Sequence, residues 1–513
     1  MQKSKTKQET PMVWPQNLNT YLGNKGYTLL KSELTTEQII KLKEMLTVKP
    51  FVPGSPVQAQ TSFPAYRESA KKMYLPQHFG AKLFGPPKEN KLPDGDDIHL
   101  VFNGELRPHQ VPIVQAYLDH VADGGGGLLE MYCGAGKTDS AIYEICQIGK
   151  KTNIVVHKEF LVDQWTERIL KYCPNARIGR IQGSVIDIED KDIVICMLQS
   201  LSMKDYPASL FDSFGLTIVD EVHRIATESF SNALFKLVTK RMLGLSATMD
   251  RKDGTSYVFK MFLGDVVYKL VRNKDEEVIV RALTFQSDDE EYNEVEMDFR
   301  GNVASSKMLS KICTYNKRSE FILRVLRDMI AENPKQQIMM IASYKNILNY
   351  MYEAINHHNI CTVGYYIGGM KAEALKESES KQVVLATYSM ASEGLDIKTL
   401  STLFMITPMT NIEQSVGRIL RQKHSFAPVV VDIVDSHENF QRQWAKRRAF
   451  FKKQNYKIIQ TTSTIYNPDT SGWRVVYNPD LPKKGQMVEE VEADDSGDDK
   501  PKSAGTCFLK FKK

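Results

Sequence analysis

The sequence lacks long apolar runs and has no apolar segment at its start. No stretch of its 513 residues approaches the roughly 18 consecutive apolar residues that a membrane-spanning helix needs. The N-terminus, MQKSKTKQET, lacks the apolar core of a secretory signal peptide. Membrane and secreted proteins are therefore not expected, and we expect a soluble protein inside a cell, with no membrane partner.

Paired cysteines and a strong charge of one sign are also missing. Seven cysteines are scattered without a CxxC pair, which favours free thiols in a reducing compartment. The net charge of +5 is a mild basic bias, which is compatible with polyanion binding but is common in proteins that bind no nucleic acid. Composition alone therefore indicates no particular function.

The chain is long enough for about three domains at roughly 150 residues each. The first hundred residues predict a small α+β unit with one helix from Thr36 to Leu46, followed by a Pro/Gly-rich stretch. From Asp97 onward, short apolar runs alternate with helical patterns, which is typical of βαβ units and a parallel sheet. The expected strands are Gly127–Met131, Thr152–Val156, Asp192–Met197, Leu216–Val219, Met242–Leu245, Gln337–Ile341, Gln382–Ala386, Thr402–Ile406 and Pro428–Ile433.

Two α/β layers in tandem follow from this rhythm, and the acidic stretch Ser287–Glu296 is expected to separate them. A helix is expected after Asp435, and the end of the chain, with its acidic cluster Glu489–Asp499, is expected to be a disordered polyampholyte tail. The predicted domains are an accessory domain over 1–100, a first α/β domain over 101–275, a second over 276–460, and a C-terminal extension and tail over 461–513.

The segment MYCGAGKT, residues 131–138, has the sequence context of a phosphate-binding loop. It lies directly after a predicted strand and before a helical pattern. Gly134, Ala135 and Gly136 would turn backbone N–H groups toward a phosphate. Lys137 would reach the β- and γ-phosphates, and the Thr138 hydroxyl would bind Mg²⁺. Met131 occupies the place of the first glycine of the strict motif, and a chance glycine-rich turn is the alternative.

The segment LTIVDEVHR, residues 216–224, delivers two adjacent acids at the end of an apolar strand. Asp220 would hold the Mg²⁺ of ATP, and Glu221 would orient and deprotonate the attacking water. A solvated loop is the alternative for such a pair taken alone. Its position after the phosphate-binding loop makes the catalytic interpretation the stronger one.

These motifs, with DEVH (220–223), GLSAT (244–248) and QSVGRILRQ (414–422), resemble superfamily 2 helicases of the DEAD/DEAH type. The resemblance covers residues 104–435 and implies two tandem RecA-like domains that use ATP and Mg²⁺. It implies arginine fingers at Arg418 and Arg421, which would share a helical face. It adds His223, Gln414 and Asp396 to the nucleotide contacts. The segment LRPHQ adds Gln110 as an adenine contact, for which a surface glutamine is an equal alternative.

Candidate nucleic-acid contacts are weaker than the nucleotide site. The resemblance places Lys158 and Gln164 in motif Ia, and Thr387 and Gly394 in motif V, where plain packing is equally compatible. The helix after Asp435 carries basic residues interleaved with aromatic ones. This strip would either bind phosphates or dock an apolar face on the second domain.

Within the superfamily, the sequence is most similar to the branch of XPB and phage UvsW, and to transcript-release helicases of poxviruses and related large cytoplasmic DNA viruses. This resemblance implies a viral, DNA-tracking motor in transcription, with roles in recombination or repair open. It also implies contact with an RNA polymerase, a monomeric state, and a place in the host cytoplasm and the virion. Three alternatives stay open: an RNA helicase, a nucleotide-dependent switch on a polymerase that does not translocate, and a nuclease subunit.

Overall fold

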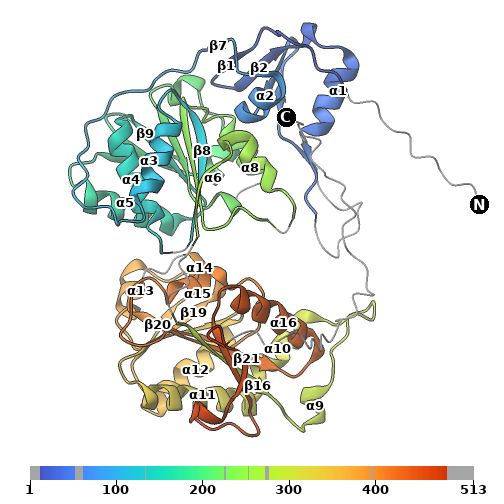
Figure 1. The fold of residues 1–513 in the computed structure, drawn as a ribbon, viewed down its shortest axis with the longest axis vertical. Helices are drawn as coiled ribbons and strands as arrows, with labels where there is room; N and C mark the ends of the chain where they lie inside the picture. Colours follow the sequence, from blue (N-terminus) through green and yellow to red (C-terminus); the bar gives the residue numbers. More distant parts are fainter. Residues whose placement is uncertain are drawn as a thin grey trace, which may run out of the picture.

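The computed structural model describes residues 12–51, 62–132, 134–224, 227–251, 253–271, 277–393 and 397–481. Two α/β lobes lie end to end, and a small N-terminal domain covers the end of the first lobe that faces away from the second (Figure 1). Each lobe is built on an eight-stranded sheet. The prediction of two tandem RecA-like domains after a small N-terminal unit is therefore confirmed. The acidic cluster Glu489–Asp499 of the predicted tail lies outside the described residues.

The first lobe has strand order β11-β10-β12-β9-β13-β14-β8-β15. Its strands pair in parallel except for β10 with β11. They are β8 (Gly125–Met131), β9 (Thr152–Val156), β10 (Ile178–Gln182), β11 (Val185–Asp187), β12 (Ile193–Met197), β13 (Leu216–Val219), β14 (Arg241–Ser246) and β15 (Val266–Leu270). One face packs against α3 (Val111–His120), α4 (Lys137–Ile148) and α5 (Glu159–Tyr172). The other packs against α6 (Leu198–Met203), α7 (Glu228–Leu234) and α8 (Ser256–Leu263).

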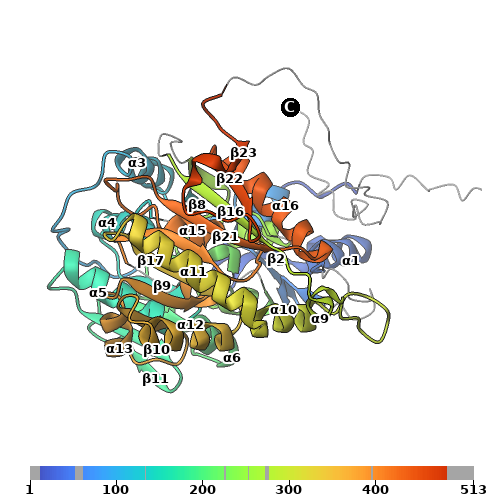
Figure 2. The ribbon, with the colours of Figure 1, turned by 90° about the horizontal axis from the view of Figure 1, so that it is seen from below.

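The second lobe has strand order β18-β19-β17-β20-β21-β16-β22-β23, again parallel except for its last pair. Its strands are β16 (Ile279–Phe285), β17 (Gln337–Ala342), β18 (Val363–Tyr366), β19 (Val383–Thr387), β20 (Leu400–Met405), β21 (Val429–Asp435), β22 (Lys457–Thr462) and β23 (Arg474–Tyr477). Its helices are α9 (Glu290–Asn293), α10 (Ser305–Thr314), α11 (Asn316–Glu332), α12 (Lys345–His357), α13 (Ala372–Ser378), α14 (Tyr388–Glu393), α15 (Glu413–Arg418) and α16 (Glu438–Lys453). Seen from below, α11 and α12 lie in front of the sheet (Figure 2).

All the strands expected from apolar runs are present, with ends that move by no more than two residues. The acidic stretch Ser287–Glu296 does not separate the lobes, and that prediction is wrong. β16 precedes it and already pairs with β21 and β22 of the second sheet. The run was missed because Arg281 interrupts it, yet Arg281 is 8% exposed and its guanidinium donates twice to Glu332 at 2.6 Å. A paired arginine can be buried in a strand in this way.

The C-terminal boundary of the second lobe lies later than the sequence suggested. β22 crosses the proposed boundary at residue 460, and β23 pairs antiparallel with β22. We therefore propose that the second lobe extends to Tyr477. The other proposed boundaries, at residues 100 and 275, fall between named strands.

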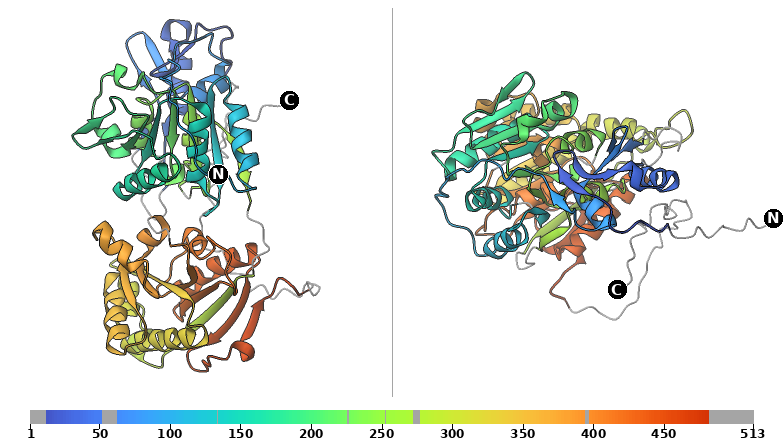
Figure 3. Two further views of the ribbon diagram at one scale, coloured as in Figure 1. Left: turned by 90° about the vertical axis from the view of Figure 1, so that its left-hand side faces the viewer. Right: turned by 90° about the horizontal axis from the view of Figure 1, so that it is seen from above.

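The N-terminal domain has a five-stranded sheet of order β5-β6-β2-β1-β7. Its elements are β1 (Tyr21–Gly23), β2 (Gly26–Leu30), α1 (Thr36–Met45), β3 (Thr47–Val48), β4 (Phe63–Pro64), β5 (Arg67–Glu68), β6 (Lys72–Leu75), α2 (Gln77–Phe84) and β7 (Glu89–Asn90). α1 confirms the helix expected at Thr36 and begins with a capping box in which Thr35 and Gln38 bond reciprocally. Figure 3 shows the domain from two further sides.

The N-terminal domain and the first lobe share one hydrophobic core. Tyr27, Met73 and Phe79 of the domain belong to the same buried cluster as Phe230 and Phe262 of the lobe. The amide of Gln77 also donates to the carbonyl of Phe262 at 3.3 Å. Because apolar side chains from both parts are buried against one another, the domain is an integral part of the first lobe rather than a tethered module.

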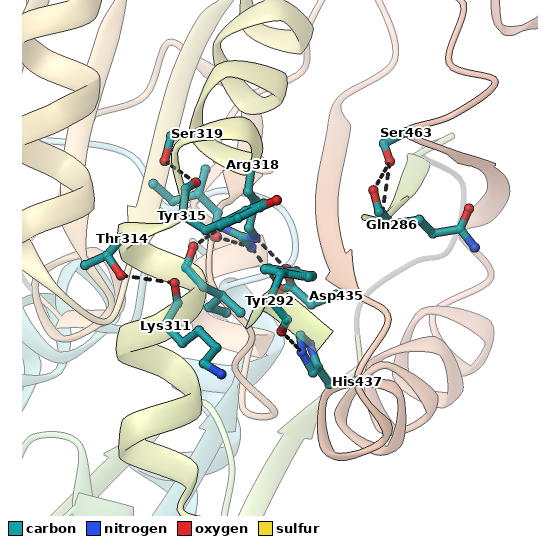
Figure 4. Close-up of polar contacts among 12 residues, drawn as sticks. Gln286, Tyr292, Lys311, Thr314, Tyr315, Arg318, Ser319, Asp435, His437 and Ser463 are labelled. Carbon is teal, nitrogen blue, oxygen red and sulfur yellow. Dashed lines mark hydrogen bonds and ion pairs between the residues drawn. The ribbon is translucent and has the colours of Figure 1, made fainter. Parts of the chain in front are cut away.

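A buried polar cluster ties helices of the second lobe to the end of β21 (Figure 4). Arg318 of α11 and Asp435 are both 0% exposed and pair through two bonds of 2.5 and 2.9 Å. The Tyr292 hydroxyl donates to the same carboxylate at 2.7 Å, and His437 lies 2.7 Å from the Tyr292 carbonyl. Loss of one partner of such a pair costs about 3–5 kcal/mol, because a buried charge is left unpaired. The cluster therefore fixes α9 and α11 on the sheet.

Within the part of the chain that the structure describes, no helix is both long enough and apolar enough to span a bilayer. The described cysteines are free thiols, as expected. Of these, Cys146 of α4 and Cys173 at the end of α5 lie closest, with 3.5 Å between their sulfurs.

Candidate nucleotide site between the lobes

The phosphate-binding loop joins β8 to α4 at the edge of the first lobe that faces the second. Gly134 has φ 88° and Gly136 has φ 85°, which is the left-handed region that favours glycine. Lys137 and Thr138 form the first turn of α4. The start of a helix presents unpaired N–H groups and a partial positive charge, so this loop has the geometry of an anion site.

Three side chains of the LRPHQ segment hold three consecutive carbonyls of this loop. Arg107 donates to the Gly134 carbonyl at 3.1 Å, and a ring nitrogen of His109 lies 3.0 Å from the Ala135 carbonyl. Gln110 donates to the Gly136 carbonyl at 3.0 Å. In a trans peptide the N–H points away from the carbonyl. Tying down these carbonyls therefore turns the following N–H groups to the opposite side. That of Ala135 donates to the Tyr132 carbonyl at 3.2 Å, so a phosphate would be met by those of Gly136 and Lys137.

Gln110 is fully engaged in this support. It is 1% exposed, its amide nitrogen donates to Gly136 and to the Ser140 hydroxyl, and its oxygen accepts from the Arg107 backbone at 2.8 Å. The predicted adenine contact stays a prediction. It would require these bonds to break, because one amide offers few further hydrogen-bonding positions.

The two acids of the DEVH segment follow β13 and face the loop. Asp220 is 7% exposed, and its carboxylate accepts from the indole N–H of Trp165 at 3.0 Å and from the Glu221 backbone at 2.9 Å. Glu221 has φ 50°, an uncommon value for a residue other than glycine. Its carboxylate lies 3.8 Å from the Lys137 ammonium. The strand end, the lysine and the two acids are thus gathered at one point.

Burial and neighbouring charges set the two carboxylates apart. Burial, together with the charge of Glu221, raises the pKa of Asp220 to about 6, against the lowering effect of Trp165 and Lys137. Burial alone would also raise the pKa of Glu221, but Lys137, His223 and Arg418 hold it well below its usual range. A carboxyl group whose pKa is raised, beside a carboxylate whose pKa is lowered, is typical of functional sites.

His223 connects this loop to the SAT segment at the end of β14. Its Nδ1 lies 2.7 Å from the Ser246 hydroxyl, and its backbone carbonyl accepts from Arg251. Arg251 is held by Asp253 through bonds of 2.5 and 3.0 Å. Burial alone would raise the pKa of Asp253, but the opposing effect of Arg251 and Thr255 is larger and lowers it to about 2. The DEVH loop is therefore fastened to the segment that follows it in the sheet.

Gln414 of the second lobe meets the DEVH loop directly. Its amide oxygen accepts from the Arg224 guanidinium at 2.6 Å, and its amide nitrogen lies 3.3 Å from Nε2 of His223. These contacts join α15 of one lobe to the loop after β13 of the other. Predicted site residues of the two lobes are thus in direct contact here.

Both candidate finger arginines lie on the phosphate-loop side. Arg418 is 7% exposed, donates to the Ala391 carbonyl at 2.8 Å, and is close enough to Glu221 to lower its pKa. Arg421 packs against Gly134: a β-carbon added there would lie 3.3 Å from Cγ of Arg421. The prediction that both share a helical face is wrong, because α15 ends at Arg418. Gly417, with its low helix propensity, precedes this end.

The nucleic-acid candidates lie on both lobes. Lys158 caps the start of α5, with its ammonium 5.9 Å from the Phe160 ring, and Gln164 is half-buried one residue before Trp165. Thr387 ends β19, and its hydroxyl lies 3.2 Å from that of Ser389. Gly394 and Asp396 lie outside the described residues. The contacts of these residues with nucleic acid stay a prediction.

The helix after Asp435 docks through its aromatic side chains. Phe440, Trp444 and Phe451 of α16 are buried. Arg447, one of the basic residues of this helix, is 0% exposed and pairs with Asp432 at 2.7 Å, so it does not lie on a basic surface strip. Lys446, Lys452 and Lys453 remain exposed.

The donor set fits ATP with Mg²⁺. The Thr138 hydroxyl and the Asp220 carboxylate are hard oxygen ligands of the kind that Mg²⁺ takes. The close packing of the loop on its support also requires glycine at Gly136, because a β-carbon there would lie 2.4 Å from the Gln110 amide. Elsewhere in the chain as described, no cluster of three or more His, Cys, Asp or Glu residues could hold a metal.

Trp165 is the supporting residue to which sequence reasoning gave no role. It is 2% exposed and bonds directly to Asp220. Its only signal was the dipeptide Gln164-Trp165 in the motif Ia segment. Arg107 and His109 stood in the quoted LRPHQ pattern without a role.

Two family matches cover the two lobes. Residues 103–251 match the family described as type III restriction enzyme, res subunit. Residues 322–423 match the helicase conserved C-terminal domain. The first contains the phosphate-binding loop and the DEVH segment, and the second ends just after Arg421.

Viral relatives match most of the chain. A protein of Acanthamoeba polyphaga mimivirus, provisionally named an ATP-dependent RNA helicase, is 33% identical over 86% of this chain and 87% of its own length. A provisionally named helicase of Invertebrate iridescent virus 6 is 26% identical over 72% of this chain and 87% of its own. An African swine fever virus protein, provisionally named an ATP-dependent RNA helicase, is 25% identical over 68% and 73%.

A solved structure, the crystal structure of T4 UvsW, is 15% identical over 86% of this chain and 98% of its own, with a TM-score of 0.33.

Proposed function

Because this chain belongs to the superfamily 2 helicases of large DNA viruses and is an ATP-hydrolysing helicase, we propose that it is a DNA-tracking motor that acts in viral transcription. In this proposal it releases transcripts from a stalled RNA polymerase in the host cytoplasm, as a monomer. Recombination or repair intermediates are further substrates of the same motion.

One observation supports the proposal: arginines of the second lobe lie close to the acids and the loop of the first, with Arg418 near Glu221 and Arg421 against Gly134. Lys137 would hold the β- and γ-phosphates, and Glu221 would orient the attacking water. Mg²⁺, held by Thr138 and Asp220, would supply charge neutralisation when bound. Arg418 and Arg421 would stabilise the charge that develops on the transferred phosphoryl group. Closure on ATP and opening after hydrolysis would then move a strand across both lobes.

The choice of DNA rests on the resemblance to the XPB and UvsW branch. ATP turnover should be measured side by side with single-stranded DNA, duplex DNA, forked DNA and RNA. We expect stimulation by DNA and displacement of a roadblock on DNA. Turnover without displacement would identify a stationary nucleotide-dependent switch and overturn the motor assignment.

RNA unwinding is the second candidate, because two of the viral relatives are provisionally named RNA helicases. The 2′-hydroxyl distinguishes the substrates. Stimulation by RNA but not by the DNA of the same sequence would favour this candidate.

Lys137→Ala tests the nucleotide site itself. We expect hydrolysis to be abolished, because the phosphate contact is lost, while circular dichroism stays that of the parent. Lys150→Ala is the matched control: Lys150 pairs with Asp94 and Asp97 after the end of α4. Retained turnover in Lys137→Ala would show that the loop does not bind the phosphates.

A further inference from the structure

The sheet of the N-terminal domain has one fully buried face and a second, which we call the open face, whose larger side chains are partly exposed. Tyr27, Leu29, Met73 and Leu75 lie on the buried face and are 0–1% exposed. Since side chains alternate along a strand, the intervening residues lie on the opposite face. At its edge this second face approaches the first lobe, where Arg67 reaches the Phe235 ring and a β-carbon added to Gly26 would lie 3.7 Å from the same ring.

Two tyrosines share one row on this open face. The register pairs Tyr21 with Thr28, and Thr28 with Tyr74, so the three side chains lie side by side across β1, β2 and β6. Thr28 is 1% exposed and fills the space between them, whereas both tyrosines are half-buried. The two rings therefore lie on the same face, on either side of Thr28.

Lysines surround both rings. The Lys25 ammonium lies 5.4 Å from the centroid of the Tyr74 ring, and those of Lys72 and Lys91 lie 5.1 and 4.7 Å from that of Tyr21. We call Tyr21, Tyr74, Lys25, Lys72 and Lys91 the tyrosine face. The one acid in the same row, Glu89, pairs with Lys91 at 3.0 Å. The tyrosine face is therefore a cationic surface with aromatic rings at its centre.

We propose that the tyrosine face is an accessory binding site for single-stranded nucleic acid. A base has a π-face that can stack on a tyrosine ring whatever its sequence, and the phosphates on either side of it attract ammonium groups. The lysines that now cover the rings are on flexible stems, so they can turn to the phosphates when a base takes their place. The proposal rests on the proposed function in one respect, that the ligand is the polynucleotide on which the motor acts.

The site lies outside the two lobes that would move the strand. The N-terminal domain covers the end of the first lobe that points away from the second lobe (Figures 1 and 3). Because it shares its core with that lobe, the tyrosine face keeps a fixed position relative to Lys158 and Gln164 on α5. A strand held here would extend the contact of the motor beyond its two lobes.

The test measures binding of the full chain to fluorescent oligo(dT) and oligo(rU) without nucleotide, over a series of salt concentrations. Lys25→Gln, Lys72→Gln and Lys91→Gln together should weaken binding, and should reduce the slope of log K against log salt by about 2, since each phosphate contact contributes roughly 0.7 for single strands. Tyr21→Leu with Tyr74→Leu should weaken binding by about tenfold or more. Tyr21→Phe with Tyr74→Phe should retain it, because the rings remain.

The matched control exchanges three exposed lysines of the second lobe, Lys307, Lys335 and Lys376, for glutamine. An equal loss of binding and slope in this control would overturn the proposal, because general charge would then explain the effect. Unchanged binding in the leucine variant, or tighter binding of duplex than of single strands, would also overturn it. Equal loss for DNA and RNA supports a site that reads bases and phosphates only.

Hydrolysis without nucleic acid, measured in parallel, separates this proposal from the proposed function. We expect the variants of the tyrosine face to retain the parent rate, which also shows that they are folded. If the parent hydrolyses ATP but moves no roadblock, while the leucine variant still loses strand binding, the motor proposal fails and the accessory site stands.

Discussion

Trp165 connects helix α5, which carries the predicted nucleic-acid contact Gln164, to Asp220, the carboxylate predicted to hold Mg²⁺. It follows Gln164 on α5, and its indole N–H is directed at Asp220 over 3.0 Å. Residues that support metal ligands commonly change metal affinity or activity by about 10–100-fold when they are removed. We therefore expect Trp165 to orient Asp220.

Trp165→Phe keeps a buried ring but removes the N–H group. We expect the Mg²⁺ concentration needed for half-maximal hydrolysis to rise by about tenfold or more, because the carboxylate loses the bond that orients it. A Mg²⁺ titration of the hydrolysis rate measures this. Trp473→Phe removes an indole bond to the Asn467 carbonyl in the other lobe and should leave the titration unchanged. Equal titrations for both variants would mean that Trp165 only fills space.

At this scale the sequence located residue types better than contacts. Lys137, Asp220 and Glu221 lie near one another as expected, because strand ends place polar residues at one edge of a parallel sheet, and their roles stay a prediction. The support from Trp165 could not be found, because α5 and β13 are separated by other strands along the chain. The engagement of Gln110 with Gly136 and Ser140 was missed for the same reason.

Helix α2 carries a buried histidine into the joint between the N-terminal domain and the first lobe. His78 faces His120 and Asp265, and its Nε2 lies 3.1 Å from the Gln77 amide nitrogen. Burial, aided by His120 and opposed by Asp265, lowers the pKa of His78 to about 4. The Gln77 amide N–H directed at Nε2 also favours the neutral ring, because only a neutral ring has a lone pair that can accept there.

The stability of this joint should fall on acidification. The folded pKa of His78 lies below the unfolded value of 6.5. The unfolded chain therefore binds more protons between pH 6.5 and 4, and stability is lost as the pH falls. Between pH 7 and 5 we expect a loss of about 2 kcal/mol from this group.

Urea unfolding of His78→Asn at the two pH values tests this. The variant should lack that share of the pH dependence, whereas His358→Asn, at an exposed position, should keep it. The same pH dependence in His78→Asn and the parent would contradict the role of His78.

Elements were predictable where one pattern dominated. Strands buried on both faces gave continuous apolar runs, and these were found almost to the residue. β16, which contains Arg281, and the burial of Arg447 were not predicted, because a charged residue is expected to be exposed unless its partner is known. The partner of Arg281 is Glu332, which is far from β16 in sequence. The partner of Arg447 is Asp432, on the strand that precedes α16. The tertiary pairing decides such positions.

For the whole molecule, the distribution of buried clusters predicts two cooperative units. One contains the N-terminal domain with the first lobe, and the other is the second lobe. The sequence indicated a separate N-terminal domain, because a change of composition marks a boundary along the chain but does not reveal a core shared across it. Calorimetry should therefore show two transitions rather than three.

Phe79→Ala and Phe404→Ala identify the transitions. Phe79 of α2 is buried in the shared core and Phe404 of β20 in the core of the second lobe. Each change should cost about 3–5 kcal/mol through the cavity that it leaves. Phe79→Ala should lower the transition of the unit that contains the phosphate-binding loop, and Phe404→Ala the other. A separate small transition, shifted by Phe79→Ala alone, would show that the N-terminal domain folds independently.

The shared core also constrains where the accessory domain can go. Because apolar side chains of the domain and of the first lobe are buried in one cluster, a rotation of one part against the other would expose that cluster to water. Any change in the position of the lobes relative to each other therefore displaces the accessory domain together with the phosphate-binding loop.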